Sequence, residues 1–143
     1  KTMERGQLNV LLGAHSPLAS RPFLRLSDLA GRPYYTMHPN VTPDGYMHTM
    51  RFFSEKNFQP HSMIPNTSHE SMMLQLQVHD EGYGLMGDFL YRSHPGLVFL
   101  PLAEEDRPSG DAFDLVAMWR ANNGNPCIPL LLSLVEKAYP GRE

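Results

Sequence analysis

Residues 13–40, GAHSPLASRPFLRLSDLAGRPYYTMHPN, decide the fold predicted for this chain. An apolar run at residues 8–12 precedes this stretch and is broken by the His-Ser-Pro of residues 15–17. The Gly-Arg-Pro turn at residues 31–33 then leads into the β-prone residues 34–37. Because glycine and proline mark places where a helix or strand cannot continue, the pattern predicts a buried strand, a polar crossing segment and entry into a second strand. Such a chain, which leaves one sheet, crosses and opens another, is typical of two-lobed α/β binding proteins.

The composition limits the class of protein. The chain has 143 residues, of which 41% are hydrophobic and 19% are charged, and this is typical of one soluble globular domain. The net charge is −3 and the basic residues form no cluster, which argues against direct contact with nucleic acid. No apolar run is long enough to span a bilayer, the first residues are not a secretory signal, and the single cysteine, Cys127, suits a reducing compartment. We therefore expect a cytoplasmic domain that contacts neither DNA nor a membrane and, because the sequence begins with Lys1, a piece of a longer protein.

Strand and helix signals alternate through the rest of the chain. Thr42 and Pro43 form a helix start, and residues 67–70 match a capping box in which Thr67 caps the helix and Glu70 reciprocates. A last helix opens at residues 125–126, with an apolar face expected to lie in the core: Ile128, Leu131, Leu132, Val135 and Ala138. Further strands are predicted at residues 62–65, 83–87, 97–100 and 112–119, and a helical turn at residues 88–92. This alternation predicts an α/β fold with a mainly parallel sheet.

Several motifs carry a family resemblance. His15 with Pro17, Leu18 and Ala19 is similar to an HPLA sequence at the end of a strand, and the Asp-Leu-Ala-Gly of residues 28–31 precedes an aromatic strand. The Glu-Gly-Tyr-Gly-Leu of residues 81–85, the apolar residues 97–102 and a strand ending in Trp-Arg at residues 119–120 follow in order. Together these motifs resemble the effector-binding domain of LysR-type transcriptional regulators over nearly the whole chain.

The resemblance implies a periplasmic-binding-protein-like (type II) fold, in which two Rossmann-type subdomains are joined by two crossing segments. Residues 15–110 are then a complete second subdomain with both hinge crossings. Residues 1–14 and 111–143 are expected to be remnants of the first subdomain, truncated at its N-terminus. In such regulators a small-molecule effector binds between the subdomains and the full-length protein forms a homodimer. DNA is contacted only through a helix-turn-helix, which is absent from this chain.

The candidate ligand site lies in two loops that precede helices. In a doubly wound sheet, ligands bind beyond the carboxyl ends of strands, where helix N-termini supply unpaired N–H groups that suit a carboxylate or another small anion. The resemblance points to the same loops as one wall of the effector cleft. The predicted effector-binding residues are His38, Asn40, Thr42, Pro65, Asn66, Thr67 and Ser68. Helix capping alone also explains Thr42, Thr67 and Ser68, and both interpretations stay open at this point.

The sequence offers no support for catalytic or metal chemistry. The seven histidines form no i, i+4 pair or compact cluster, and the HESMM of residues 69–73 lacks the second histidine of a zinc motif. No nucleophile–base pair, paired carboxylates or glycine-rich phosphate loop is recognisable, so we expect no enzyme, no catalytic residues, no metal and no cofactor. The predicted function is an effector-sensing regulatory domain that binds a small molecule. The alternative is a solute-binding lobe of the periplasmic type.

Overall fold

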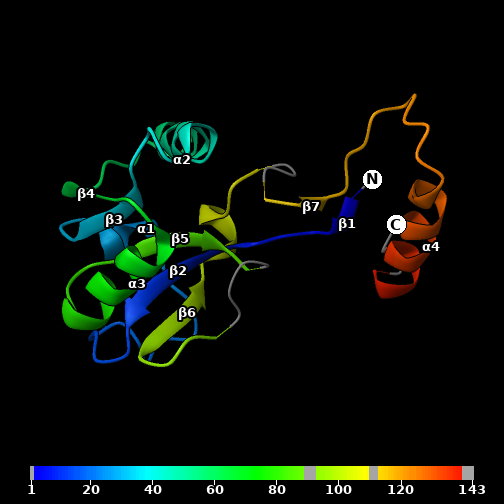
Figure 1. The fold of residues 1–143 in the computed structure, drawn as a ribbon. Coiled ribbons are helices and arrows are strands. Elements are labelled where there is room, and N and C mark those ends of the chain that lie inside the picture. The colour runs from blue at the N-terminus through cyan, green and yellow to red at the C-terminus, as the bar shows by residue number, and fades with distance from the viewer. Residues whose placement is uncertain (1, 89–92, 110–112, 140–143) are drawn as a thin grey trace.

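The computed structural model describes residues 2–88, 93–109 and 113–139. Figure 1 shows a main lobe and, beyond it, a pair of short strands and a last helix. The alternation of strands and helices confirms the predicted α/β class. In chain order the elements are β1 (Thr2–Glu4), β2 (Leu8–Gly13), α1 (Leu26–Leu29), β3 (Pro33–Met37), α2 (Pro43–Glu55), β4 (Ser62–Asn66), α3 (His69–Val78), β5 (Gly84–Gly87), β6 (Leu97–Pro101), the short 3₁₀ helix η1 (Glu104–Asp106), β7 (Leu115–Val116) and α4 (Cys127–Ala138).

The lobe is built on a sheet in which one strand is reversed. β2 lies between β5 and β6 and is antiparallel to both, so β5 and β6 run in the same direction. β3 and β4 are parallel, and β3 joins β5 through a parallel bridge between Tyr34 and Tyr83. At this bridge the Tyr35 N–H donates to the Tyr83 carbonyl at 2.8 Å, and the Tyr83 N–H donates to the Pro33 carbonyl at 3.0 Å. The strand order is therefore β4-β3-β5-β2-β6, and the prediction of a mainly parallel sheet is confirmed for these strands except β2.

β2 lies in a different place from the one predicted. The sequence interpretation assigned residues 1–14 to a remnant of the first subdomain, whereas residues 8–13 form the central strand of the lobe. Val10, Leu11 and Leu12 are fully buried, because neighbours pack on both faces of the strand. A short apolar run predicts a buried strand, but it does not say which sheet that strand joins.

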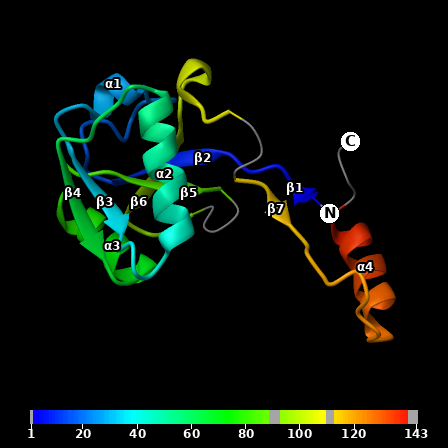
Figure 2. The same ribbon diagram turned by 90° about the horizontal axis from the view of Figure 1, so that it is seen from above.

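Helices cover both faces of the sheet, because successive side chains of a strand point to opposite faces. Val10 and Leu12 of β2 belong to the core that includes Phe53 of α2 and the leucines of α1. Leu11 belongs to the opposite core, with Leu76 and the methionines of α3. Figures 1 and 2 show α2 and α3 on opposite sides of the strands accordingly.

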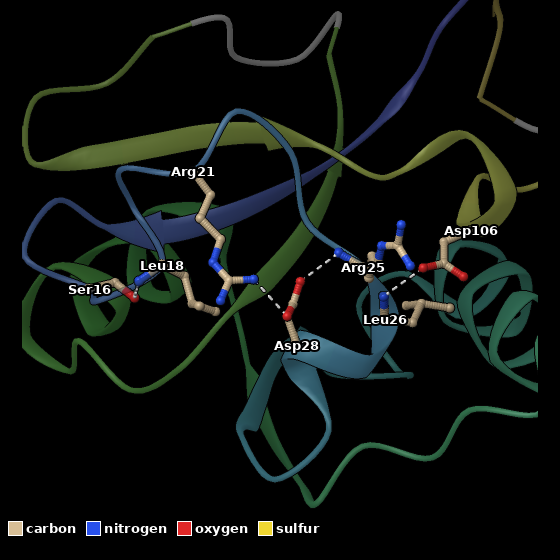
Figure 3. Close-up of polar contacts among 7 residues, drawn as sticks. All are labelled: Ser16, Leu18, Arg21, Arg25, Leu26, Asp28 and Asp106. Carbon is tan, nitrogen blue, oxygen red and sulfur yellow. Dashed lines mark hydrogen bonds and ion pairs between the residues drawn. The ribbon is translucent and has the colours of Figure 1, made fainter.

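The segment that decided the prediction folds around Asp28 (Figure 3). The Arg25 N–H donates to Asp28 Oδ2 at 2.9 Å, and the Arg21 guanidinium pairs with Asp28 Oδ1 at 2.7 Å. The hydrogen bond from the Arg25 backbone is the main reason that the pKa of the Asp28 carboxyl is lowered; partial burial opposes it and Arg21 reinforces it. The Leu26 N–H donates to Asp106 Oδ2 at 2.9 Å, so the start of α1 also holds the second crossing segment in place.

β1, β7 and α4 lie outside the lobe (Figures 1 and 2). β1 pairs with β7 in an antiparallel ladder, and β7 covers only Leu115–Val116 of the strand predicted at residues 112–119, of which residue 112 is not described. No residue of α4 is buried, and Leu131 is 55% exposed. The prediction that one face of α4 lies in the core is therefore wrong, because the apolar face exists but no described element buries it.

Two further points concern the extent of the elements. The helical turn predicted at residues 88–92 falls, apart from Asp88, outside the described residues. Among the helices that are described, none has the length and apolar character needed to cross a membrane.

Candidate functional site

A pocket of about 310 Å³ opens at the edge of the sheet where β3 and β5 end and β2 begins. Parallel strands present their carboxyl ends at this edge, which is where α/β sheets bind ligands. The first two turns of α2, the start of α3 and one residue that precedes β7 complete its walls. The lining residues are Leu8, Tyr34, Thr36, Met37, Thr42, Gly45, Tyr46, Thr49, His69, Met72, Leu85, Met86, Gly87 and Phe113.

Three side-chain hydroxyls in the pocket, from Tyr34, Thr36 and Thr49, form what we call the hydroxyl cluster. Side-chain hydrogen bonds link the Tyr34 hydroxyl to Thr36 and Thr49, and burial raises its pKa above the usual 10.0 against the effect of these bonds. Thr36 Oγ1 donates to the Met37 carbonyl at 3.4 Å, and Thr49 Oγ1 donates to the Gly45 carbonyl at 3.0 Å. A hydroxyl is both a donor and an acceptor and can rotate, so the cluster can either donate to or accept from a ligand.

The rest of the lining is mainly apolar and comes from both the lobe and the crossing segments. The methionine thioethers are flexible and adapt to the shape of what they contact. Leu8 follows the segment at residues 5–7 that joins β1 to β2, and Phe113 lies in the segment that leads into β7. The two segments are tied together, because the Gly6 N–H donates to Asp114 Oδ1 at 3.1 Å. A molecule in this pocket therefore contacts both segments that leave the lobe.

The first predicted loop supplies one residue to the pocket, Thr42. Thr42 is the N-cap residue of α2, but its side chain accepts no capping hydrogen bond. The His38 carbonyl accepts from the Val41 N–H at 2.8 Å and from the Thr42 N–H at 3.2 Å, and His38 Nδ1 accepts from the Asn40 N–H at 3.1 Å. His38 and Asn40 thus shape the loop and are not among the residues that line this pocket.

The second predicted loop mainly holds the structure together. Asn66 is buried; its amide donates to the Ile64 carbonyl at 3.0 Å and its Oδ1 accepts from Ser71 Oγ at 3.3 Å. Ser68 Oγ accepts from the Ser71 N–H at 3.1 Å, so Ser68 is the N-cap of α3 and the predicted capping role of Thr67 is wrong by one residue. Pro65 and Thr67 are exposed, and neither they nor Asn66 and Ser68 line this pocket.

Sequence reasoning missed most of the polar residues that the pocket brings together: Tyr34, Thr36, Tyr46, Thr49 and His69. A signal for them is present in the sequence. Tyr34 and Thr36 are two apart on a strand and therefore share a face. Thr42, Tyr46 and Thr49 recur at helical spacing and mark a polar face of α2.

Metal-binding groups do not gather within the part of the chain that the structure describes. There, no group of three or more histidine, cysteine, aspartate or glutamate side chains is placed to hold a metal ion. The single cysteine, Cys127, is exposed at the first position of α4.

Comparison with known families decides the assignment. The family model of the LysR substrate binding domain matches residues 4–139. The chain belongs to this family. The prediction that this chain has a periplasmic-binding-protein-like (type II) fold is therefore confirmed. No curated protein matched the chain.

Solved LysR-type structures share the fold. HinK, a LysR family transcriptional regulator from Pseudomonas aeruginosa, is 20% identical with a TM-score of 0.71, over 96% of this chain and 47% of its own. The effector-binding domain of QuiR in complex with shikimate is 19% identical with a TM-score of 0.66, over 97% of this chain and 64% of its own. The BenM effector-binding domain with benzoate is 18% identical with a TM-score of 0.68, over 97% and 62%. The chain thus spans between about half and two thirds of the length of these structures.

Proposed function

We propose that this chain is the effector-sensing part of a LysR-type transcriptional regulator and binds a small organic acid in the pocket where β3 and β5 end. The observation that carries the proposal is the pocket itself, which lies where α/β sheets bind ligands, in a chain of a substrate-binding family. The solved relatives QuiR and BenM hold shikimate and benzoate, which are both carboxylic acids built on one ring.

The start of α2 supplies donors for the acid group. Because the Thr42 side chain does not cap the helix, the first N–H groups of α2, at Asp44 and Gly45, have no side-chain acceptor. The Thr42 hydroxyl and the His69 ring line the same pocket. A carboxylate placed here accepts hydrogen bonds from these groups and is favoured by the positive end of the helix dipole. The apolar side chains then contact the ring.

The crossing segments give the binding event a route to the rest of the protein. An effector that contacts Leu8 and Phe113 lies against both segments, which are joined by the bond from Gly6 to Asp114. An effector changes the arrangement of the subdomains only if its affinity differs between the two arrangements. Contact with both crossing segments supplies a physical source for that difference.

The finer parts of the sequence prediction belong to this proposal. We place residues 15–110 in the second subdomain, add β2 to it, and assign the remainder of residues 1–14 and 111–143 to the first. The full-length regulator is then a cytoplasmic homodimer without catalytic activity that contacts DNA through a helix-turn-helix. The family match favours this function over the alternative, a solute-binding lobe of the periplasmic type.

The experiment is a binding titration with benzoate and shikimate. Binding is measured by calorimetry and by the rise in Tm that a ligand of the folded state produces. The double variant Thr42→Val/His69→Ala removes two polar groups of the pocket. We expect it to weaken binding by about tenfold or more, because hydrogen bonds to a charged group are lost. Thr67→Ala, on the exposed neighbour of the N-cap, is the control and should bind as the parent does. Equal binding by the double variant and the parent would place the acid elsewhere.

A further inference from the structure

The segment between β7 and α4 contains an asparagine followed by a glycine, Asn123 and Gly124. Asparagine is a chemically labile residue, because the backbone nitrogen of the next residue can attack its side-chain amide carbon, Cγ. A side chain on that next residue shields the nitrogen with its Cβ, whereas glycine has no Cβ. An Asn-Gly pair is therefore reactive wherever the fold leaves the glycine nitrogen free.

The backbone nitrogen of Gly124 is free in the structure. Its N–H donates to no other residue in the described part of the chain. Residues 121–127 are all exposed, and a Cβ built at Gly124 meets nothing within 4 Å. The described residues therefore do not obstruct the approach of this nitrogen to the Asn123 side chain.

Three other exposed asparagines lack this freedom. After Asn40, Asn57 and Asn122, the next backbone N–H donates to a carbonyl oxygen at 2.8, 2.9 and 3.1 Å respectively. A nitrogen whose proton is held in this way must break that hydrogen bond before it can attack. The backbone therefore protects these three asparagines, although each is exposed.

The remaining asparagines are blocked in other ways. Asn9 lies in the central strand β2 and is followed by Val10, which is fully buried. Asn66 is buried, and hydrogen bonds hold both the nitrogen and the oxygen of its side-chain amide. Asn125 precedes Pro126, which has no N–H. Asn123 is thus the asparagine that the fold leaves open to attack.

The side-chain amide of Asn123 is also activated. Its Oδ1 accepts a hydrogen bond from the Asn125 N–H at 3.1 Å. This donor draws electron density from Cγ and stabilises the negative charge that develops on Oδ1 as the nitrogen attacks. The bond therefore favours the reaction without occupying the Gly124 nitrogen.

We propose that Asn123 is a site of spontaneous deamidation, in which its side chain and the Gly124 nitrogen close a succinimide ring. The Gly124 nitrogen forms a bond to Asn123 Cγ, the bond from Cγ to Nδ2 breaks, and the proton of the Gly124 N–H leaves with Nδ2 as ammonia. Water then opens the ring. Cleavage of the bond between the ring nitrogen and Cγ yields aspartate, and cleavage of its bond to the backbone carbonyl carbon yields isoaspartate. The reaction consumes only water, and the inference does not rest on the proposed function.

The modification changes the outlying part of the molecule. Both products add one negative charge at residue 123, and isoaspartate also inserts one carbon into the main chain between β7 and α4. Residues 121–127 are not among those that line the pocket of the lobe. The reaction therefore gives the chain a time-dependent change in the connection to α4 and leaves the pocket unchanged.

The test follows the whole chain during incubation at pH 8. Trypsin cuts after Arg120 and Lys137, so residue 123 is recovered in the peptide 121–137. We expect this peptide to gain one mass unit, with fragment ions that assign the gain to residue 123, and to separate on a column into an aspartate and an isoaspartate form. The synthetic peptide 121–137 is the reference for an unprotected Asn-Gly pair.

Two variants isolate the attacking nitrogen. Gly124→Ala should slow the gain of mass by roughly tenfold or more, which corresponds to a barrier only about 1.4 kcal/mol higher. The added Cβ has space, and Gly124 is not among the described glycines with a positive φ, so we expect this variant to fold as the parent does. Asn122→Gln, at the exposed neighbouring asparagine, is the matched control and should react at the rate of the parent.

Three outcomes would overturn the inference. The peptide from the folded chain could keep its mass while the synthetic peptide converts, which would mean that the fold protects Asn123. Equal rates in Gly124→Ala and the parent would mean that the Gly124 nitrogen is not the attacking group. A gain of mass without any isoaspartate would mean that no succinimide ring forms.

Discussion

Asp28 shows what a family motif means at the level of one residue. Its carboxylate accepts the Arg25 N–H and pairs with Arg21, which fixes the start of α1. The next residue, Leu29, is fully buried, and Gly31 has a φ of +94°, a conformation that favours glycine. Three positions of the Asp-Leu-Ala-Gly motif, Asp28, Leu29 and Gly31, therefore have a structural role. The motif therefore predicts the fold and carries no information about the ligand.

Tyr34 and Tyr83 form a pair in which identical hydroxyls have opposite environments. The rings stack with centroids 5.2 Å apart. The Tyr34 hydroxyl is hydrogen-bonded to Thr36 and Thr49, whereas the buried Tyr83 hydroxyl has no partner among the described residues. We expect Tyr34→Phe to lower the free energy of unfolding by about 1 kcal/mol and Tyr83→Phe to leave it unchanged or raise it by up to about 1 kcal/mol. Urea denaturation at pH 8 measures both, and a large loss in Tyr83→Phe would mean that its hydroxyl has a partner.

The same pair sets a dependence on alkaline pH. Burial raises the pKa of both hydroxyls above 10.0, and for Tyr83 the neighbouring Tyr34 adds to the effect. A group whose pKa is higher in the folded state contributes stability that is complete below the unfolded value and is lost as the pH rises above it. Tyr83→Phe should therefore resist alkaline unfolding to a higher pH than the parent does. Circular dichroism of Tyr83→Phe and of the parent, measured from pH 9 upward, tests this prediction. Unfolding of both at the same pH would contradict it.

At the scale of the element, the start of α3 shows the limit of a capping motif. Thr67 and Ser68 are adjacent, both have a hydroxyl, and either fits a sequence pattern for an N-cap. In the structure Ser68 accepts the Ser71 N–H at 3.1 Å and Thr67 is exposed. We expect Ser68→Ala to destabilise the protein by about 1 kcal/mol and Thr67→Ala to change its stability by less than about 0.5 kcal/mol. Denaturation of the two variants side by side measures the difference, and the reverse order would restore the predicted role of Thr67.

The sequence predicts those features of the fold and the site that depend on local patterns, and it misses those that depend on contacts between distant residues. The elements at β3, β4, β5 and β6 follow from local patterns of apolar residues, glycine and proline, and these were predicted within a few residues. The position of β2 in the centre of the sheet depends on pairing with β5 and β6, which lie more than 70 residues later in the chain, and no local pattern encodes it. The pocket is missed for the same reason, since Tyr34, Thr49 and His69 come together only when three elements pack.

At the scale of the whole molecule, the chain consists of a packed lobe and an outlying part formed by β1, β7 and α4 (Figure 1). The amphipathic pattern of α4 predicts a helix with an apolar face, and the helix is present. Such a pattern does not say what covers the face, and in this chain Leu130, Leu131 and Leu134 are all more than half exposed. The pocket lies on the side of the lobe from which both crossing segments leave, because Leu8 and Phe113 line it. The outlying part is therefore connected to the lobe at the place where a ligand would bind.

Two leucines, one in the packed lobe and one in the outlying part, test this division of the chain. Leu29 is fully buried in the lobe and Leu131 is 55% exposed on α4. We expect Leu29→Ala to lower the free energy of unfolding by about 3 kcal/mol and Leu131→Ala to change it by less than about 0.5 kcal/mol. Far-ultraviolet circular dichroism in urea is the suitable measurement, because the single tryptophan, Trp119, lies between β7 and α4 and does not report on the lobe. A cost for Leu131→Ala close to that of Leu29→Ala would mean that α4 is covered in solution. If that cost then grew with protein concentration, the cover would be a second copy of the chain; if it did not, α4 would pack within its own chain.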